Sequence, residues 1–422
     1  MEAVRQDTTA KDRFQVLMID PANYSPHYDI PLCDALVAAG VYVRLVTSRF
    51  AYEASSDTVR EYVDEGFYRA ATGLRARGRC RQVLCGLEHG FDWLGVLRRV
   101  ATARVPVIVH SQWLPVPLVD LWFLTAARRA GAALVHTVHN LKPNLELRGT
   151  LRQCEALYTI ADCLIAHTSR TAEGLVREFG VPPTKILRIR HGTIGDQYAM
   201  VSRAEARERL RLGREDRVAL FFGALRQQKG LQNLIAAFPA VLARCPAAKL
   251  LIAGRPEGLS ASDVRALREA AGIPPERVVS CLEYIPTSDV PVYFGAADVV
   301  VCPYTQADQS GALILGLTLG RPAVVSDVGG LPEIVQHGVH GLVTPAGDVA
   351  ALAGAVAELV CEPEKARQMG EAGRRMALEE WGWGAVAGQT LEAYRLALAM
   401  RGLASTGDAI TNGGAVTVES RK

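Results

Sequence analysis

The sequence predicts an α/β protein built from two doubly wound, Rossmann-like domains that face each other across a cleft. The chain has 422 residues, more than a single hydrophobic core normally supports. Short apolar runs typical of buried strands alternate with helical patterns along most of its length, and this alternation is typical of parallel sheets covered by helices on both faces. Two such series follow each other, which predicts two domains. In sheets of this kind we expect ligands beyond the carboxyl ends of the strands, here in the cleft.

The first series forms the predicted N-terminal domain, residues 1–200. Its predicted helices include residues 31–39 and 118–130. Its predicted strands are short apolar runs that end in polar or turn-forming residues. They span residues 14–19, 41–47, 105–109, 133–138, 163–166 and 186–189.

The second series forms the predicted C-terminal domain, residues 201–380. It opens with a helical stretch rich in Arg and Glu, residues 201–212, which we interpret as a surface connector. Residues 401–422 lose periodicity and large apolar side chains, so we expect a disordered tail there. The predicted strands of this domain span residues 218–222, 248–253, 278–281, 299–302, 323–326 and 341–343.

The composition argues against several classes of protein. The formal net charge is only +3, and no recognition motif accompanies it, so we expect no nucleic-acid partner. Apolar runs are too short to cross a bilayer, and the start MEAVRQDTTAKD is not typical of a secretory leader. The nine cysteines are scattered without a C-x-x-C pair, which favours reduced core thiols over disulfides or a zinc site. We therefore expect a soluble, cytoplasmic protein.

Positive charge concentrates in the first half of the chain. Residues 1–195 contain 24 Lys/Arg and 19 Asp/Glu and carry +5, whereas the remainder carries −2. Alternating arginines, and an apolar run followed by arginines, could lie against an anionic membrane surface at the inner face of the membrane. We prefer the simpler interpretation, a solvated helix face. The residues concerned are Arg75, Arg77, Arg79, Arg81, Phe91, Trp93, Leu94, Val96, Leu97, Arg98, Arg99 and Arg104.

Two cations follow the first strand of the second domain. In VALFFGALRQQKGLQNLIAAF, Arg226 and Lys229 lie between a strand and a helix, where a phosphate-bearing ligand is expected. The helix dipole disfavours cations at a helix start. This mismatch favours a binding role over a pair of solvated surface charges.

Glycine-containing turns follow two later strands. Gly311 opens a helix after DVVVCPY, and the free N–H groups of a helix start can bind an anion, although a Ser-Gly loop can also simply cap a helix. Gly329 and Gly330 precede Glu333. The Glu333 carboxylate could accept hydrogen bonds from ribose or sugar hydroxyls, or it could stabilise the start of its own helix.

These segments resemble the nucleotide-sugar-binding half of the group 1 (family 4) glycosyltransferases of the GT-B fold. The resemblance is strong over residues 215–395 and more diffuse over residues 13–195. The combination of the segment DVPVYFGAADVVVCPY with a Gln-Ser-Gly loop resembles family members that assemble bacterial exopolysaccharide. Residues 381–400 resemble the family's terminal helix, which returns to the N-terminal domain. The motifs are FFGALRQQKGLQNLI, LLIAGRPEG, YIPTSDVPVYFGAADVVVCPY, DQSGALILGLTLGRPAVVSDVGGLPEIV and HGLVTPAGD.

The resemblance implies a nucleotide-diphosphate sugar as co-substrate and no other cofactor. It implies that Arg226 and Lys229 bind the diphosphate, that the backbone after Gly311 approaches it, and that Tyr284 and Ile285 lie near the base. The donor-binding residues expected in this way are Gly223, Arg226, Lys229, Arg255, Tyr284, Ile285, Asp308, Ser310, Gly311, Ala312, Leu313 and Glu333.

One departure from the family pattern concerns two acidic positions. The family carries two glutamates eight positions apart around the Gly311 loop, where this chain has Asp308 and Gly316. Asp308 keeps a carboxylate with a shorter reach. Gly316 removes the usual ribose ligand, and Glu333 could compensate for it.

Histidines mark the strand ends of the first domain. VPVIVHSQWLP and ALVHTVHNLKPN place His110, His136 and His139 at the carboxyl ends of predicted strands, where an imidazole can donate or accept a hydrogen bond near neutral pH. The segment around His139 resembles the family's histidine strand end, whose imidazole contacts the transferred sugar. Tyr24 and Tyr28 lie in the loop after the first strand, where they could bind a sugar or close the loop. The expected acceptor-binding residues are Tyr24, Tyr28, His110 and His139.

The predicted function is transfer of a sugar to a saccharide or lipid-linked acceptor in polysaccharide or glycolipid assembly. The resemblance implies retention at the anomeric carbon. No D-x-D sequence occurs, so we expect no metal site. A nucleotide-sugar epimerase of the same fold and a non-catalytic nucleotide-sugar-binding partner remain open as alternatives. The expected catalytic residues are His139, Arg226, Lys229 and Asp308.

Overall fold

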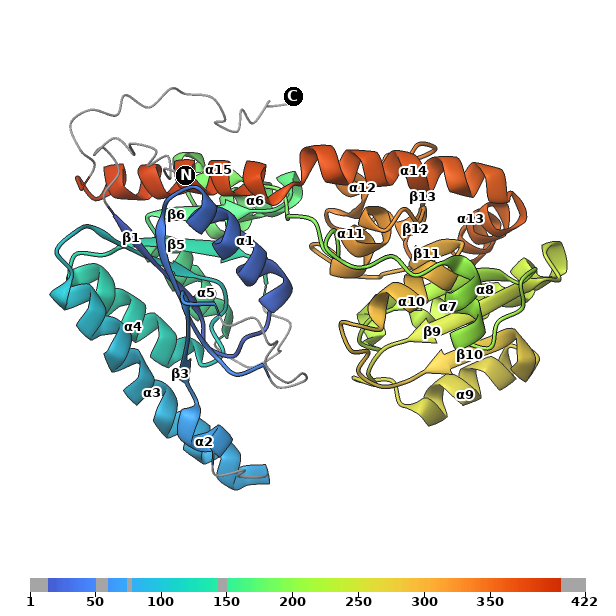
Figure 1. The fold of residues 1–422 in the computed structure, drawn as a ribbon, viewed down its shortest axis with the longest axis horizontal. Coiled ribbons are helices and arrows are strands. Elements are labelled where there is room, and N and C mark those ends of the chain that lie inside the picture. Colours follow the sequence, from blue (N-terminus) through green and yellow to red (C-terminus); the bar gives the residue numbers. More distant parts are fainter. Residues whose placement is uncertain (1–13, 51–59, 74–77, 143–149, 404–422) are drawn as a thin grey trace, which may run out of the picture. The chain divides into compact units, whose positions relative to one another are not determined.

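The computed structural model describes residues 14–50, 60–73, 78–142 and 150–403. The chain divides into two compact units. Unit 1 comprises Met1–Gly192 and Trp383–Lys422, and unit 2 comprises Thr193–Gly382. Each unit is a parallel sheet with helices on both faces (Figure 1), which confirms the predicted α/β class with two Rossmann-like domains.

The sheet of unit 1 has seven strands in the order β3-β2-β1-β4-β5-β6-β7, all parallel. The predicted strands are confirmed with shifts of one or two residues at some ends. The edge strand β3 was not predicted because its sequence, VDEGF, is polar and contains a glycine. The strands are β1 (Gln15–Asp20), β2 (Tyr42–Ser48), β3 (Val63–Phe67), β4 (Val107–Ser111), β5 (Ala133–Val138), β6 (Cys163–Ala166) and β7 (Ile186–Arg188).

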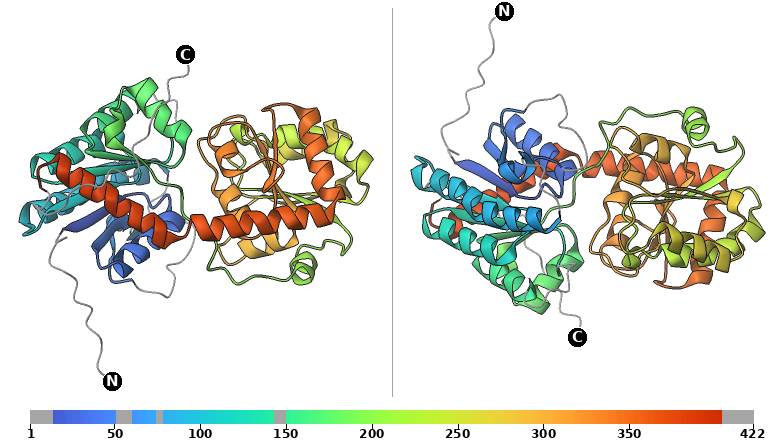
Figure 2. Two further views of the ribbon diagram at one scale, coloured as in Figure 1. Left: turned by 90° about the horizontal axis from the view of Figure 1, so that it is seen from above. Right: turned by 90° about the horizontal axis from the view of Figure 1, so that it is seen from below.

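Helices cover both faces of this sheet (Figure 2). α15 (Trp383–Met400) packs against α1 and buries Tyr394 in the same apolar cluster as β1 and β5. α3 and α4 cover the opposite face through a second cluster that includes Trp93, Val96 and Phe123. The last helix of the chain is therefore part of the core of unit 1. The remaining helices are α1 (Pro26–Ala38), α2 (Arg69–Gly73), α3 (Gly78–Thr102), α4 (Pro117–Arg129), α5 (Thr150–Ile160) and α6 (Ser169–Phe179).

The sheet of unit 2 has six parallel strands in the order β10-β9-β8-β11-β12-β13. They are β8 (Arg217–Phe222), β9 (Ala248–Ala253), β10 (Val278–Cys281), β11 (Val299–Cys302), β12 (Ala323–Ser326) and β13 (Gly341–Thr344). The helices are α7 (Arg203–Arg209), α8 (Leu231–Arg244), α9 (Ala261–Ala270), α10 (Val290–Ala296), α11 (Gly311–Thr318), α12 (Leu331–Ile334), α13 (Val349–Cys361) and α14 (Pro363–Glu380).

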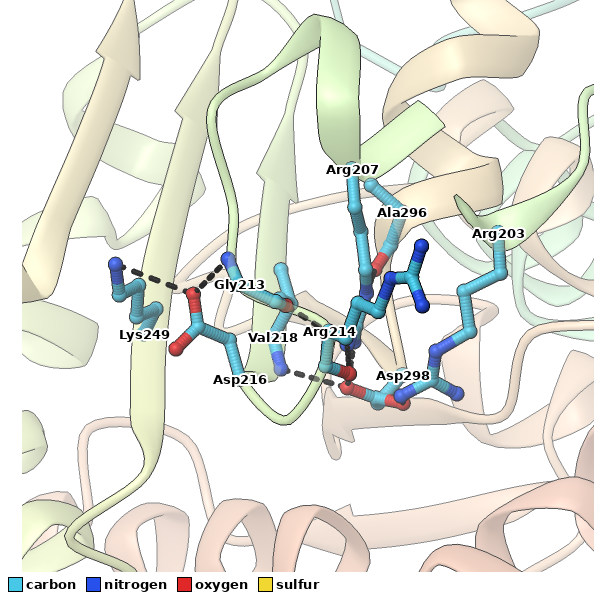
Figure 3. Close-up of polar contacts among 9 residues, drawn as sticks. All are labelled: Arg203, Arg207, Gly213, Arg214, Asp216, Val218, Lys249, Ala296 and Asp298. Carbon is cyan, nitrogen blue, oxygen red and sulfur yellow. Dashed lines mark hydrogen bonds and ion pairs between the residues drawn. The ribbon is translucent and has the colours of Figure 1, made fainter. Parts of the chain in front are cut away.

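A buried ion pair fixes α7 to the amino ends of the strands of unit 2 (Figure 3). The guanidinium of Arg207, 2% exposed, donates to the Asp298 carboxylate (2.9 Å) and to the Ala296 carbonyl (3.3 Å). Asp298 also accepts from the Val218 amide (2.7 Å) and pairs with Arg203 (2.6 Å). The Asp298 carboxylate thus has three partners: Arg207, Arg203 and the Val218 amide. We therefore assign the two arginines a structural role at the amino edge of the sheet.

The strand order defines one switch point in each sheet. In unit 1, β1 lies between β2 and β4, and in unit 2, β8 lies between β9 and β11. The connections from the two central strands lead to opposite faces of the sheet, which leaves a crevice between their loops. The loops after β1 and β4, and those after β8 and β11, are therefore the places to look for ligand-binding residues.

The arginine-rich and apolar segments of the first half divide between core and surface. In α3, Trp93 and Val96 are buried, whereas Phe91 and Leu94 are exposed, so the apolar run is not a single outward face. Arg75 and Arg77 lie outside the described residues, as do residues 404–422 of the expected tail. No helix among the described residues is long and apolar enough to cross a membrane.

Candidate active site

The loops on either side of the switch point of unit 2 are joined through Lys229. The ammonium Nζ of Lys229 lies 5.6 Å from the ring centroid of Tyr304, in the loop after β11. The neighbouring Gln228 carbonyl accepts a hydrogen bond from the Thr305 amide (2.8 Å). A cation from the loop after β8 therefore lies beside the loop after β11. This is the place, beyond the carboxyl ends of the central strands, where a ligand is expected.

Gly223 makes room for this ammonium. Its φ is +115°, and a Cβ added there would lie 2.8 Å from Lys229 Nζ. Burial lowers the pKa of Lys229, and the nearby Arg226 lowers it further. A partly desolvated ammonium interacts more strongly with an anion than a surface lysine does.

Two arginines beside Lys229 share one carboxylate. The guanidinium of Arg226 contacts Glu257 at 2.6 Å, and that of Arg255 contacts the second oxygen of Glu257 at 2.9 Å. Burial alone would raise the pKa of Glu257, but hydrogen bonds from Arg255 and Arg226 lower it. Both arginines belong to the expected donor-binding set, whereas Glu257 was not predicted, because its only signal is its position in the RPEG turn after β9.

The start of α11 lies next to Tyr304. The Ser310 hydroxyl caps the helix by accepting from the Leu313 amide (3.2 Å) and hydrogen-bonds the Tyr304 hydroxyl (2.9 Å). The first N–H groups of the helix, from Gly311 and Ala312, have no intrahelical acceptor. Lys229, Tyr304 and the helix start thus form one connected group in which a positive charge lies near free backbone donors.

The Gly329–Gly330 turn packs directly on the loop of Asp308. The Gly330 amide donates to the Asp308 carbonyl (3.0 Å). Gly329 has φ +55°, and a Cβ there would lie 1.5 Å from the Ala307 carbonyl oxygen. Asp308 is half-buried, and Glu333 in the first turn of α12 is exposed. This contact brings the two glycine-containing loops of the expected donor site together.

Other positions of the expected donor set are more peripheral. Gly316 faces β11, since a Cβ there would lie 3.0 Å from a Val300 methyl. Tyr284 is half-buried and Ile285 is buried in the loop after β10. A base contact by these two residues stays a prediction.

The switch point of unit 1 is lined by aromatic rings. Tyr24, in the loop after β1, is 62% exposed and meets Trp113, after β4, edge to face at 5.8 Å. Trp113 stacks on the ring of His139 at 4.8 Å. His139 Nε2 lies 2.8 Å from the Gln112 side-chain oxygen, so this nitrogen carries the proton. Three strand ends thus contribute to one aromatic group.

A histidine cluster surrounds Tyr28. Its buried ring contacts His139 (5.1 Å), His167 (5.3 Å) and His191 (4.8 Å). Burial, reinforced by the neighbouring imidazoles, lowers the pKa of His139 well below its usual value. The ring is therefore a neutral donor and acceptor at physiological pH. His167 and His191 were not among the predicted site residues, although both follow strands, β6 and β7.

His110 and His136 lie inside unit 1. His110 is fully buried, with its ring nitrogens bonded to Tyr394 (2.9 Å) and Thr137 (2.8 Å). His136 contacts the Ser111 hydroxyl and carbonyl, each at 2.9 Å. These contacts favour packing roles, and acceptor binding by His110 stays a prediction.

A carboxylate, an imidazole and a phenol form a hydrogen-bonded chain that was not predicted. Asp120 Oδ1 lies 2.7 Å from His89 Nε2, and His89 Nδ1 lies 2.8 Å from the Tyr68 hydroxyl. Asp120 also accepts from the Trp93 indole N–H (2.8 Å) and the Val116 amide (2.8 Å). In the tautomer with the proton on Nε2, His89 donates to Asp120 and accepts from Tyr68. His89 lies in the middle of α3, where no strand end or motif marks it.

Two buried carboxyl groups, Asp20 at the end of β1 and Asp29 in α1, interact with each other. Asp20 and Asp29 are both almost fully buried. Burial raises the pKa of Asp20 to about 6, and burial together with the Asp20 charge raises that of Asp29 well above its usual value. The pair therefore holds a proton under conditions in which surface aspartates are ionised.

Comparisons with known proteins agree with this arrangement. Residues 216–362 match the family described as "Glycosyl transferases group 1", and residues 31–193 match "Glycosyltransferase Family 4". A D-inositol 3-phosphate glycosyltransferase from Thermobispora bispora is 28% identical over an alignment that covers 72% of this chain and 74% of that protein.

Solved structures share the fold at lower identity. Sucrose-phosphate synthase from Thermosynechococcus elongatus superposes with a TM-score of 0.70 at 22% identity, covering 92% of this chain and all of that one. Anabaena Alr3699/HepE, solved in complex with UDP and glucose, gives a TM-score of 0.69 at 19% identity, covering 90% of this chain and 99% of that one. With one family matched on each unit, the chain belongs to the group 1 (family 4) glycosyltransferases of the GT-B fold.

Proposed function

We propose that the protein binds a nucleotide-diphosphate sugar on unit 2 and transfers its sugar to a saccharide or lipid-linked acceptor bound on unit 1. The group formed by Lys229, Tyr304 and the start of α11 carries this proposal. It combines a partly buried cation with free backbone donors, the two features that hold a diphosphate. The Anabaena structure contains UDP and glucose, so uridine-linked sugars are the first donors to test.

The chemistry assigned to these residues is stabilisation of the leaving group. When the bond from the anomeric carbon to the phosphate oxygen breaks, its electron pair stays on the nucleotide. Lys229, Arg226 and the N–H groups of Gly311 and Ala312 would stabilise that charge. The acceptor oxygen then bonds to the anomeric carbon, and its proton passes to the departing phosphate oxygen. We propose retention of the anomeric configuration, as the family resemblance implies, and transfer without metal, as expected from the lack of a D-x-D sequence.

The acceptor side rests on the aromatic group of unit 1. Tyr24 and Trp113 offer apolar ring surfaces of the kind that sugars stack against. Gln112 fixes the His139 imidazole with Nε2 protonated, and we propose that His139 binds the transferred sugar in this neutral form. A role in exopolysaccharide or glycolipid assembly fits an acceptor recognised by stacking.

The test is turnover with a panel of nucleotide sugars and acceptors. Lys229→Met and Arg226→Met should each reduce acceptor-dependent nucleotide release about 100- to 1,000-fold, the usual cost of losing a preorganised charge contact. The matched control is Lys249→Met, which removes a lysine paired with Asp216 (3.1 Å) at the amino edge of the same sheet (Figure 3). The turnover of Lys249→Met should stay close to that of the wild type. Chelation of metal ions with EDTA should change the turnover of neither the wild type nor Lys249→Met.

Other outcomes would contradict the proposal. Donor isomerised in the absence of an acceptor would identify an epimerase. Tight nucleotide binding without turnover across the panel would identify a non-catalytic binding protein. Equal losses in Lys229→Met and Lys249→Met would show that Lys229 has no special role.

A further inference from the structure

The outer faces of α3 and α4 carry large apolar side chains that the core does not use. On α3, Leu87, Phe91 and Leu94 are 63%, 72% and 51% exposed. On α4, Leu118 and Trp122 are 68% and 62% exposed. Single exposed apolar residues are common, but a cluster of this size marks an interaction surface.

The spacing of these residues places them opposite the core. Leu87, Phe91 and Leu94 are three or four residues apart and therefore share one side of α3, while Trp93 and Val96 are buried on the other side. In α4, Leu118 and Trp122 likewise lie opposite the buried residues Phe123, Leu124 and Ala127.

The two helices lie side by side on one face of the sheet (Figures 1 and 2). Because each leads from the carboxyl end of one parallel strand to the next strand, the two run in the same direction. The two apolar stripes therefore form one surface, which we call the α3–α4 face. Along α3, the stretch from Leu87 to Leu94 is about 10 Å long.

The charge on the α3–α4 face is positive. Exposed Arg98 follows Leu94 by one helical turn, and exposed Arg129 ends the stripe of α4. Among the described side chains of α3 and α4, each of the three carboxylates already accepts hydrogen bonds from donors of the same unit. Glu88 accepts from the Ala70 and Ala71 amides, Asp92 from the Tyr68 amide, and Asp120 is buried against His89.

We propose that the α3–α4 face docks on an anionic lipid bilayer. Leu, Phe and Trp side chains on a helix lying in the membrane plane enter the boundary between headgroups and acyl chains, and flanking arginines bind anionic headgroups. A second copy of the chain fits less well, because the carboxylates of this face already accept hydrogen bonds within their own unit and do not offer a ready partner to the arginines of another copy. The proposal does not depend on the proposed transferase reaction.

Vesicle sedimentation of the full-length protein, without donor or acceptor, tests the proposal. The wild type should bind phosphatidylcholine vesicles containing about 30 mol% phosphatidylglycerol more tightly than pure phosphatidylcholine. Phe91→Asp combined with Trp122→Asp should weaken binding at least about tenfold. Arg98→Gln and Arg129→Gln should each weaken it about fivefold, and only on the anionic vesicles.

The matched control is Leu378→Asp on α14 of unit 2, where the side chain is 44% exposed. It should bind vesicles like the wild type, and unchanged melting temperatures would show that all variants are folded. Absence of wild-type binding, or equal binding by the Phe91/Trp122 double variant, would overturn the proposal. So would self-association without lipid that the double variant abolishes, because the occupant would then be a second copy.

Discussion

At the scale of single residues, Asp120 illustrates how one buried carboxylate can organise several neighbours. It accepts hydrogen bonds from the His89 imidazole, the Trp93 indole and the Val116 backbone. His89 and Trp93 belong to α3, Val116 lies just before α4, and Asp120 itself lies in α4. Loss of this acceptor therefore affects more than one element.

We predict that Asp120→Asn lowers the free energy of unfolding by about 2–4 kcal/mol, because an amide cannot accept from all these donors and leaves a buried donor unsatisfied. Denaturant titration measures this change. The matched control is Asp34→Asn, whose half-exposed carboxylate pairs with Arg60 and should contribute less than about 1 kcal/mol. Equal effects of the two substitutions would contradict the structural role of Asp120.

Residues at strand ends were the ones that the sequence could identify. His139 follows β5 directly and Lys229 lies in the loop between β8 and α8, so the position of ligands in parallel sheets placed both near a ligand. Glu257 lies 31 residues from Arg226, and His89 lies 31 residues from Asp120. Such pairs depend on how separate elements pack, which no local pattern encodes.

At the scale of elements, the turn between β12 and α12 depends on a glycine. Gly329 has positive φ and packs against the Ala307 carbonyl, while Gly330 donates to Asp308. The turn therefore supports the loop that leads into α11.

We predict that Gly329→Ala destabilises unit 2 and weakens nucleotide binding at least about tenfold, because the new Cβ must displace the Asp308 loop. Isothermal titration with UDP measures the affinity. Gly338→Ala is the control, since Gly338 also has positive φ (+80°) but has no neighbouring atom within 4 Å of an added Cβ. It should cost about 1 kcal/mol of stability and leave UDP binding unchanged, so a similar loss of affinity in both variants would reject the proposed support.

Central strands that are mostly apolar were predicted best. β5, β6, β9, β11 and β12 begin and end at the predicted residues, because strands buried on both faces read as nearly continuous apolar runs. The polar edge strand β3 was missed for the opposite reason. The edge strand β10 was predicted to the residue, although its side chains are only partly buried. The two faces of α3 were not separated in advance, since the prediction treated its apolar run as one surface.

At the scale of the whole molecule, titratable groups buried in unit 1 make stability depend on pH. Burial is the main cause of lowered pKa values for five histidines: His110 and His167 to about 3, His136 and His191 to about 4, and His139 well below its usual value. A base with a lowered pKa contributes stability above pH 6.5, and this contribution is lost as the pH falls toward 4. Asp20 and Asp29 act in the opposite direction, because their raised pKa values favour the folded state as the pH falls below about 6.

We predict that the histidines dominate, because five groups oppose two, and that unit 1 loses about 2 kcal/mol or more between about pH 7.5 and about pH 5. Hydrogen exchange of β4 and β5 at the two pH values measures this loss within unit 1, with β9 and β11 of unit 2 as the internal reference. Unchanged or increased protection of β4 and β5 at the lower pH would contradict the prediction.

The place of α15 in unit 1 has a consequence for protein synthesis. Unit 2 is encoded entirely between the two segments of unit 1, and Tyr394 near the end of the chain completes the apolar cluster that contains β1 and β5. On the ribosome, unit 2 can finish folding while the sheet of unit 1 still lacks its last helix. The first segment of unit 1, which is synthesised before unit 2, therefore completes its packing after it, and its apolar surface stays accessible to chaperones until α15 has been synthesised.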